Sequence, residues 1–181
     1  MDGGRDRQDA GRGGPGGGPG RWLRLALMLW PLLAGPATGA ELVGKPRVID
    51  GNTLDFSGRI VRLYGIDAPD REQTCRAGGK SWACGLEARW AVINRLGRHW
   101  VTCVDKGKDR QGRNLAVCYL AGIGQLDLNA WLVSRGWALA DPTVARDYLA
   151  EEDAARRRRK GLWRGEFVPP ADWRRGRRLA P

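Results

Sequence analysis

From residue 47 to residue 66 the chain alternates apolar and polar positions in short runs that are separated by turn-forming pairs. A two-residue period is typical of half-buried strands, and the pairs Gly51-Asn52 and Ser57-Gly58 are typical of tight turns. The pattern predicts three strands, at 47–50, 53–56 and 59–66. A loop rich in Pro, Asp, Gly and Cys is expected over 67–80.

Further along the chain the apolar residues recur every three or four positions. Trp82, Leu86, Trp90 and Ile93 have this helical spacing and predict a helix over 81–96, which Gly97 ends. Apolar runs on either side of a polar segment then predict a hairpin. The remaining predicted elements are strands 99–105 and 114–120, the turn 106–113, and helices 127–135 and 143–160.

The order of these elements is three strands, a helix, two strands and two helices. This order indicates an α+β fold, and five short strands with glycine-marked corners suit a five-stranded OB-fold (Greek-key) β-barrel with three helices. Tryptophans at helical spacing are expected in the core of such a fold, and base-stacking platforms are the alternative.

The N-terminal part has a different pattern. Residues 1–20 are Gly-rich and polar, which predicts a disordered extension. Residues 21–40 combine a basic flank, an apolar run of about a dozen residues and a small-residue exit, the parts of a secretory signal. We therefore expect export to the periplasm or medium. The alternative is a membrane anchor formed by residues 22–35, so any membrane contact is expected only through this segment if it stays uncleaved.

Composition adds a charge asymmetry to this picture. The 181 residues carry a net charge of +11, and one His excludes a His-cluster metal site. Residues 156–181 contain nine Arg and one Lys but only two acidic residues, whereas residues 41–155 are almost balanced. The run 156–160 suits an anionic partner such as nucleic acid, and it equally suits the solvated end of a helix.

Four cysteines in an exported chain predict two disulfides. In an antiparallel hairpin, opposite residues have a constant sum of residue numbers; for Cys103 and Cys118 it is 221, which centres the turn between residues 110 and 111. Opposite Cα atoms lie roughly 4.5–5.5 Å apart, within disulfide reach. This pairing leaves Cys75 and Cys84 to form the second bond. The alternative is four buried free thiols in a cytosolic protein.

Three segments place polar side chains beside strand ends, at 50–53, 62–70 and 109–113. Their carboxylates suit a hard cation such as Ca²⁺, which prefers oxygen ligands. Their arginines suit a phosphodiester, because guanidinium groups form paired hydrogen bonds with phosphate oxygens. A further carboxylate suits the activation of an attacking water.

Five segments together resemble the staphylococcal-nuclease-like, or thermonuclease, family. They are V-I-D-G-N-T at 48–53, V-R-L-Y-G-I-D-A-P-D at 61–70, D-R-Q-G-R-N-L-A at 109–116, L-V-S-R-G-W-A at 132–138 and A-R-R-R-R-K-G-L-W at 155–163. The resemblance covers about residues 43–167. It implies an OB-fold barrel with three helices and Ca²⁺-dependent cleavage of DNA and RNA, and the cysteine arrangement is similar to that of exported bacterial members.

The resemblance also implies roles for individual residues. Arg62 and Arg113 match the two catalytic arginines that bind phosphate, and Asp70 matches the carboxylate that handles the attacking water. Arg110 and Gln111, in the same turn as Arg113, are expected to contact the substrate. The implied Ca²⁺ ligands are the side chains of Asn52 and Asp67 and the carbonyl of Ala68, with Asp50 as a supporting acid.

Four positions depart from the family pattern. Asn52 replaces a second Ca²⁺-binding Asp, and Asp70 replaces a Glu that is one methylene longer, so both metal binding and catalysis are expected to be weakened. Gln111 replaces a Tyr. Asp141-Pro142 stand where many relatives have an aromatic residue, whose stacking is worth roughly 1–3 kcal/mol per base.

Two functions and one structural alternative follow. The first function is that of an exported Ca²⁺-dependent nuclease acting on DNA or RNA. Its domain is expected at 41–167, followed by a basic C-terminal tail at 168–181. The second is a catalytically impaired OB-fold module that binds nucleic acid or protein. In the structural alternative, Arg62 and Arg113 form ordinary surface ion pairs with Asp67 and Asp70. No protein partner is inferred for the nuclease.

Overall fold

The protein was analysed as a computed structural model, which describes residues 41–122 and 124–180. The expected disordered extension at 1–20 and the signal-like segment at 21–40 lie outside the described residues. In the part of the chain that is described, none of the helices has the length and apolar character needed to span a membrane.

The predicted strands form the centre of a seven-stranded sheet with the order β1-β8-β9-β4-β3-β2 and with β10 beside β9. The pair β4–β9 is parallel and the other neighbours are antiparallel. The five predicted strands keep an OB-type order, but β1 and β10 raise the count above the five that were expected. The strands are β1 (Glu41–Gly44), β2 (Arg47–Asp50), β3 (Thr53–Phe56), β4 (Arg59–Leu63), β8 (Val101–Lys108), β9 (Asn114–Leu120) and β10 (Leu126–Asp127).

The predicted strand 59–66 is interrupted. Gly65 has a φ of 71°, in the left-handed region, so the chain turns after Leu63 and leaves the main sheet. The next two residues form β5 (Ile66–Asp67), which pairs with β11 (Leu139–Ala140). Asp67 therefore lies in a separate two-stranded sheet beside the barrel strands.

Residues 41–122 and 124–180 form four α-helices and a 3₁₀ helix, where three helices were expected. Helix α1 begins at Cys84 because residues 80–82 pair as a strand, and α3 begins only after the turn at Asp141, whose carboxylate accepts a hydrogen bond from the backbone N–H of Thr143. Helix α4 was not predicted. Their bounds are α1 (Cys84–Leu96), α2 (Leu128–Ser134), α3 (Leu149–Arg157), the 3₁₀ helix (Gly161–Arg164) and α4 (Pro170–Arg174); the small hairpin is β6 (Cys75–Ala77) and β7 (Lys80–Trp82).

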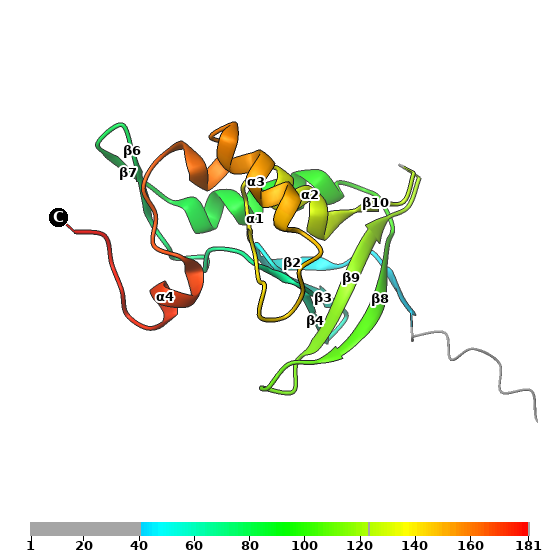
Figure 1. The fold of residues 1–181 in the computed structure, drawn as a ribbon. Helices are drawn as coiled ribbons and strands as arrows, with labels where there is room; N and C mark the ends of the chain where they lie inside the picture. The colour runs from blue at the N-terminus through cyan, green and yellow to red at the C-terminus, as the bar shows by residue number, and fades with distance from the viewer. Residues whose placement is uncertain (1–40, 123, 181) are drawn as a thin grey trace, which may run out of the picture. The chain divides into compact units, whose positions relative to one another are not determined.

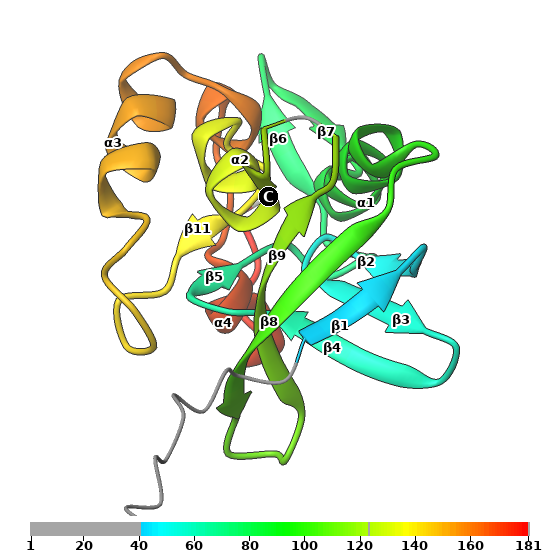
Figure 2. The same ribbon diagram turned by 90° about the vertical axis from the view of Figure 1, so that its right-hand side faces the viewer.

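Helices α1, α2 and α3 gather on one side of the sheet, and α4 lies apart from them beside β5 (Figures 1 and 2). The main core fills the space between the sheet and these helices, with fully buried leucines at positions 54, 120, 128 and 132. In both views the turn between β8 and β9 projects beyond the sheet.

Both predicted disulfides are present. Cys103 and Cys118 face each other across β8 and β9, as the hairpin argument predicted, and Cys75 is bonded to Cys84 at the start of α1. The second bond belongs to a small separate core with the buried Leu162 and the partly buried Trp82 and Phe167.

Candidate active site

The first wall of the candidate site is formed by β4 and β5. Arg62 on β4 donates from Nη2 to Oδ1 of Asp67 on β5 at 2.9 Å. Their side chains are only 17% and 12% exposed, so this ion pair is largely shielded from water. We call Arg62 and Asp67 the barrel pair.

The barrel pair is positioned by the core. The fully buried Asn129 on α2 donates from Nδ2 to the carbonyl of Tyr64 at 2.9 Å, and its Oδ1 accepts the backbone N–H of Cys118 at 3.3 Å. The N–H of Leu63 donates to the carbonyl of Asn52 at 2.8 Å. These bonds fix the turn between β4 and β5, and with it the position of Asp67.

The turn at 50–52 packs against Ala68, the residue that follows Asp67. A Cβ added at Gly51 would lie 2.8 Å from the Cβ of Ala68, so only glycine allows this close approach. Asp50 accepts the backbone N–H of Asn52 at 2.9 Å. Asn52 is 3% exposed, and its Nδ2 finds no hydrogen-bond partner within the described chain. Asn52 and Ala68 therefore lie in adjacent segments at one end of the site.

The second wall is the turn between β8 and β9. Arg113 donates from Nε to Oδ2 of Asp109 at 2.6 Å and from Nη2 to Oε1 of Gln111 at 3.2 Å. Oδ1 of Asp109 accepts the backbone N–H groups of Gln111 and Arg113, both at 2.9 Å. We call Arg113 and Asp109 the turn pair; its hydrogen bonds all come from within five consecutive residues.

Both walls face one cleft of about 770 Å³. Arg62 lines it from the barrel, and Arg113, Arg110 and Gln111 line it from the turn. Asp141, at the position where many relatives have an aromatic residue, also lines it. The basic run 156–160 is not among the described residues that line the cleft.

A third arginine, which the sequence analysis did not identify, completes the site. Arg174 is the last residue of α4 and donates from Nη2 to Oδ2 of Asp67 at 2.6 Å and from Nη1 to Oδ1 of Asp70 at 2.9 Å. It also lines the cleft. The sequence predicted only a basic tail at this position. Pro169-Pro170 could have indicated a helix start there, but no pattern linked this helix to the site.

The structural alternative from the sequence is therefore half right. Arg62 does form an ion pair with Asp67, but this pair is largely shielded from water rather than on the surface. Arg113 pairs with Asp109, and the partner of Asp70 is Arg174. Of the expected site positions, the arginines 62, 110 and 113 and Gln111 line the cleft. Asp67 and Asp70 adjoin it through their bonds to Arg62 and Arg174, whereas residues 50, 52 and 68 are not among its lining residues.

The two carboxylates on opposite walls have pKa values shifted in opposite directions. Burial raises the pKa of Asp67 above 3.8, and the bonds and charges of Arg174 and Arg62 offset this only in part. Desolvation also raises the pKa of Asp109, but the hydrogen bonds from Arg113 and Gln111 outweigh it and hold the pKa below 3.8. Burial lowers the pKa of Arg174, yet its bonds with Asp67 and Asp70 outweigh burial and leave that pKa above its usual value.

The donor atoms can be compared with those that Ca²⁺ prefers, which are about six to eight oxygens from carboxylates, amides, carbonyls and water. The carboxylates of Asp67 and Asp70 converge on one positive group, Arg174. In residues 41–122 and 124–180, no three His, Cys, Asp or Glu side chains form a group that could hold a metal ion. Asp67 would fit a cation that is also coordinated by water and by amide or carbonyl oxygens, once Arg174 no longer holds its carboxylate.

The amino-acid sequence is similar to those of known proteins over most of the segments that form this cleft. The family model described as staphylococcal nuclease homologue matches residues 60–165. The chain is 33% identical over 145 residues to the succinoglycan biosynthesis protein ExoI of Rhizobium meliloti (strain 1021), covering 78% of this chain and 74% of that protein. It is 34% identical over 173 residues to protein ParB of Escherichia coli, covering 84% and 90%.

A third relative has a name that refers to an activity. The chain is 29% identical over 165 residues to an uncharacterized endonuclease of Haemophilus influenzae, covering 87% of this chain and 86% of that protein. The matched family segment includes both walls of the cleft, from β4 through the turn at 109–113, but ends before α4. The chain therefore belongs to the staphylococcal nuclease homologue family.

Proposed function

We propose that this protein is an exported nuclease that hydrolyses phosphodiester bonds in DNA or RNA with the help of Ca²⁺. Family membership and the endonuclease name of one relative support nuclease activity in general. The observation that carries the specific proposal is that Arg62 and Arg113 line one cleft. Asp67 is bonded to Arg62, and Asp70 is bonded to Arg174, which also lines the cleft.

The arginines suit the negative charge of the reaction. Arg62 and Arg113 would bind the phosphate oxygens from two sides, and their positive charge would stabilise the extra charge of the transition state. Asp70, which is 39% exposed in its side chain, would accept a proton from the attacking water. As the water oxygen bonds to phosphorus, the P–O bond to the leaving sugar breaks and the leaving oxygen takes up a proton.

The proposed metal ligands are Asp67, Asn52 and the carbonyl of Ala68, with Asp50 shaping the turn that holds Asn52. A bound Ca²⁺ would supply positive charge beside the phosphate. The raised pKa of Asp67 supports this proposal, because a carboxylate that burial destabilises gains from a nearby cation. Asn52 provides an oxygen without a formal charge, which weakens the site relative to one with two aspartates.

Export is supported by the two disulfides, because such bonds persist in oxidising compartments. The pair Cys103–Cys118 links the strands that lead to the turn pair, and Cys75–Cys84 links the loop after Asp70 to α1. Both walls of the proposed site are therefore attached to segments that oxidation stabilises.

The test is cleavage of single-stranded DNA and of RNA by the oxidised protein, with Ca²⁺ or with a chelator. Cleavage that requires Ca²⁺ and is lost in Arg62→Ala would support the proposal. Arg59→Ala is the matched control, because Arg59 lies three residues earlier on β4, is exposed and does not line the cleft. Absence of cleavage by folded protein, or an equal loss in both variants, would contradict it.

One observation favours a second candidate, a nucleic-acid-binding module that does not cleave. Both carboxylate oxygens of Asp67 are bonded to arginines, and Asn52 lacks the charge of the expected aspartate. Under this proposal the protein binds DNA or RNA with an affinity that falls steeply with salt, and no cleavage follows at any Ca²⁺ concentration. Fluorescence anisotropy beside the cleavage assay separates the two candidates.

A further inference from the structure

We propose that Arg174, which also holds Asp70, competes with a divalent cation for the carboxylate of Asp67, so that the C-terminal segment 166–180 is a strap that controls access of the cation. This inference concerns regulation of the site and rests on the proposed function. It starts from the observation that one guanidinium holds one oxygen of each carboxylate, at 2.6 and 2.9 Å.

The contacts of Arg174 and of a cation exclude each other. A cation bound by Asp67 requires a carboxylate that Arg174 already holds through Oδ2. If both were present, two positive groups would lie within a few ångströms of each other in a partly buried site, where charges of the same sign repel strongly. Asp67 also accepts from Arg62, so no oxygen of Asp67 is left without an arginine while Arg174 is bound.

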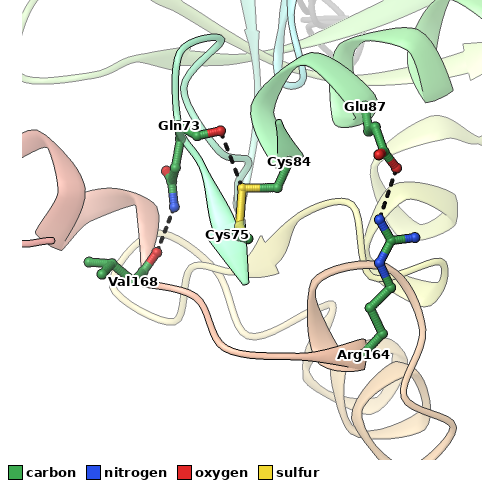
Figure 3. Close-up of a disulfide and its surroundings, with 6 residues drawn as sticks. All are labelled: Gln73, Cys75, Cys84, Glu87, Arg164 and Val168. Atoms are coloured by element: carbon green, nitrogen blue, oxygen red, sulfur yellow. Dashed lines mark hydrogen bonds and ion pairs between the residues drawn. A yellow bond between two sulfur atoms is a disulfide. The ribbon is translucent and has the colours of Figure 1, made fainter. Parts of the chain in front are cut away.

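The strap has its own attachment points at its start. The buried Gln73 donates from Nε2 to the carbonyl of Val168 at 2.7 Å (Figure 3). The backbones of Arg76 and Glu166 exchange two hydrogen bonds, at 2.9 and 2.7 Å. These contacts do not involve Asp67 or Asp70, so the beginning of the strap remains bound when Arg174 leaves the carboxylates.

The loop that holds the strap also carries one of the two carboxylates that Arg174 holds. Asp70 and Gln73 lie in the same loop, and Cys75–Cys84 fixes this loop to the first residue of α1 (Figure 3). The chain there is packed closely, since a Cβ added at Gly85 would lie 1.7 Å from the carbonyl oxygen of Asp70. Asp70 and the attachment point of the strap are therefore parts of one rigid unit, and Arg174 is the element that moves.

The exposure of the participants is consistent with movement. The side chain of Arg174 is 38% exposed and that of Asp70 is 39% exposed, whereas that of Asp67 is 12% exposed. Beyond Arg174 the segment is held by Arg178, which stacks on Trp173 with the guanidinium carbon 3.6 Å from the ring centroid, and by a hydrogen bond from Arg76 to the carbonyl of Ala180. Release of Arg174 thus leaves a buried carboxylate facing the cleft without unfolding the core.

The experiment measures Ca²⁺ binding by calorimetry on the intact oxidised protein, without any nucleic acid. We expect Arg174→Gln to bind Ca²⁺ about tenfold or more tightly than the wild type, within the range typical of coupling between two sites. Arg175→Gln is the matched control. It removes the same charge from the adjacent residue, which is 70% exposed and pairs with Asp172 rather than with the site carboxylates, and its Ca²⁺ affinity should equal that of the wild type.

A second readout follows the strap itself by hydrogen exchange. In the wild type, saturating Ca²⁺ should speed exchange of the backbone amides at 172–177, which are bonded within the strap, and leave α2 unchanged. Arg174→Lys adds an intermediate step, because one ammonium group does not hold both carboxylates in a fork, so its Ca²⁺ affinity should lie between those of the wild type and Arg174→Gln.

The outcomes are independent of cleavage. Equal or weaker Ca²⁺ binding by Arg174→Gln, no Ca²⁺ binding by either protein, or unchanged exchange at 172–177 would overturn the strap proposal. An inactive protein that shows the expected affinities and exchange would contradict the nuclease and leave the competition intact.

Discussion

The barrel pair and the turn pair join the same two residue types at similar distances, 2.9 Å for Arg62–Asp67 and 2.6 Å for Arg113–Asp109. Their carboxylates nevertheless respond in opposite ways. Burial dominates at Asp67 and raises its pKa, whereas hydrogen bonds from a local turn dominate at Asp109 and lower its pKa. The presence of an ion pair therefore does not determine the free energy of ionising its carboxylate, because burial and backbone hydrogen-bond donors also contribute.

The difference indicates what each wall contributes. In the turn pair, hydrogen bonds stabilise the ionised carboxylate of Asp109, and this carboxylate orients the partly exposed Arg113. In the barrel pair, the carboxylate of Asp67 is poorly solvated. Its ionised form therefore lowers the stability of the fold, but it attracts positive charge strongly. We therefore expect substitutions in the barrel pair to change cleavage and stability more than substitutions in the turn pair.

The largest effect is expected for Arg62→Ala. Removing one preorganised donor to developing phosphate charge typically lowers the rate by about 10²–10³-fold. Arg113→Ala should lower it less, because the half-exposed Arg113 loses part of its effect to movement and to water. Single-turnover cleavage measures both rates, and an equal or larger loss in Arg113→Ala would contradict the asymmetry.

The next effect concerns Asn52→Asp. This substitution restores the carboxylate of the family pattern beside Asp67, and a tighter Ca²⁺ site follows from the added charge, by about tenfold or more at an effective dielectric of about 20. Asn52→Ser, which adds no charge, is the control. Calorimetry that finds Asn52→Asp no tighter than the wild type would show that position 52 is not a ligand.

A smaller effect of opposite sign is expected for Asp67→Asn. Because the pKa of Asp67 is raised, its contribution to stability is complete below pH 3.8 and is lost as the pH rises through its value in the folded state. At pH 7 the ionised side chain therefore costs stability. Asp67→Asn should increase the free energy of unfolding by about 0.5–2 kcal/mol at pH 7, the range typical of stabilising substitutions at functional sites.

Urea denaturation at several pH values measures this difference. The advantage of Asp67→Asn should shrink as the pH falls toward 3.8, because the wild-type carboxyl then becomes neutral as well. Lower stability of Asp67→Asn at pH 7 would mean that the two arginine contacts outweigh burial, and the contrast between the two pairs would then fail.

The smallest effect is expected for Asp109→Asn. The lowered pKa of Asp109 means that its contribution is present above pH 3.8 and is lost as the pH falls through its value in the folded state. Removing the charge should reduce the free energy of unfolding at pH 7 by less than about 1 kcal/mol, as for other exposed pairs. A stabilised Asp109→Asn would contradict the opposite signs of the two sites.

The sequence predicted the parts of this molecule that depend on local order. The hairpin, its disulfide and the turn carrying Arg113 follow from residues close together in the chain. The break at Gly65 was missed because the apolar alternation continues through it, and the first strand was missed because four residues at 41–44 acquire a partner only in β8. The contact of Arg174 with Asp67 spans 107 positions, and no periodic pattern encodes such a contact.

Asn129 has a consequence for the order in which the molecule forms. Its bond to Tyr64 joins residues 65 positions apart, so the turn that carries Asp67 reaches its final place only when α2 docks on the sheet. Contacts of such long range are expected late in folding, after local hairpins have formed. The candidate site is then completed late in folding. A partly folded chain in which all strands are paired but the Asn129–Tyr64 hydrogen bond is missing would contain both arginines while Asp67 is not yet in place.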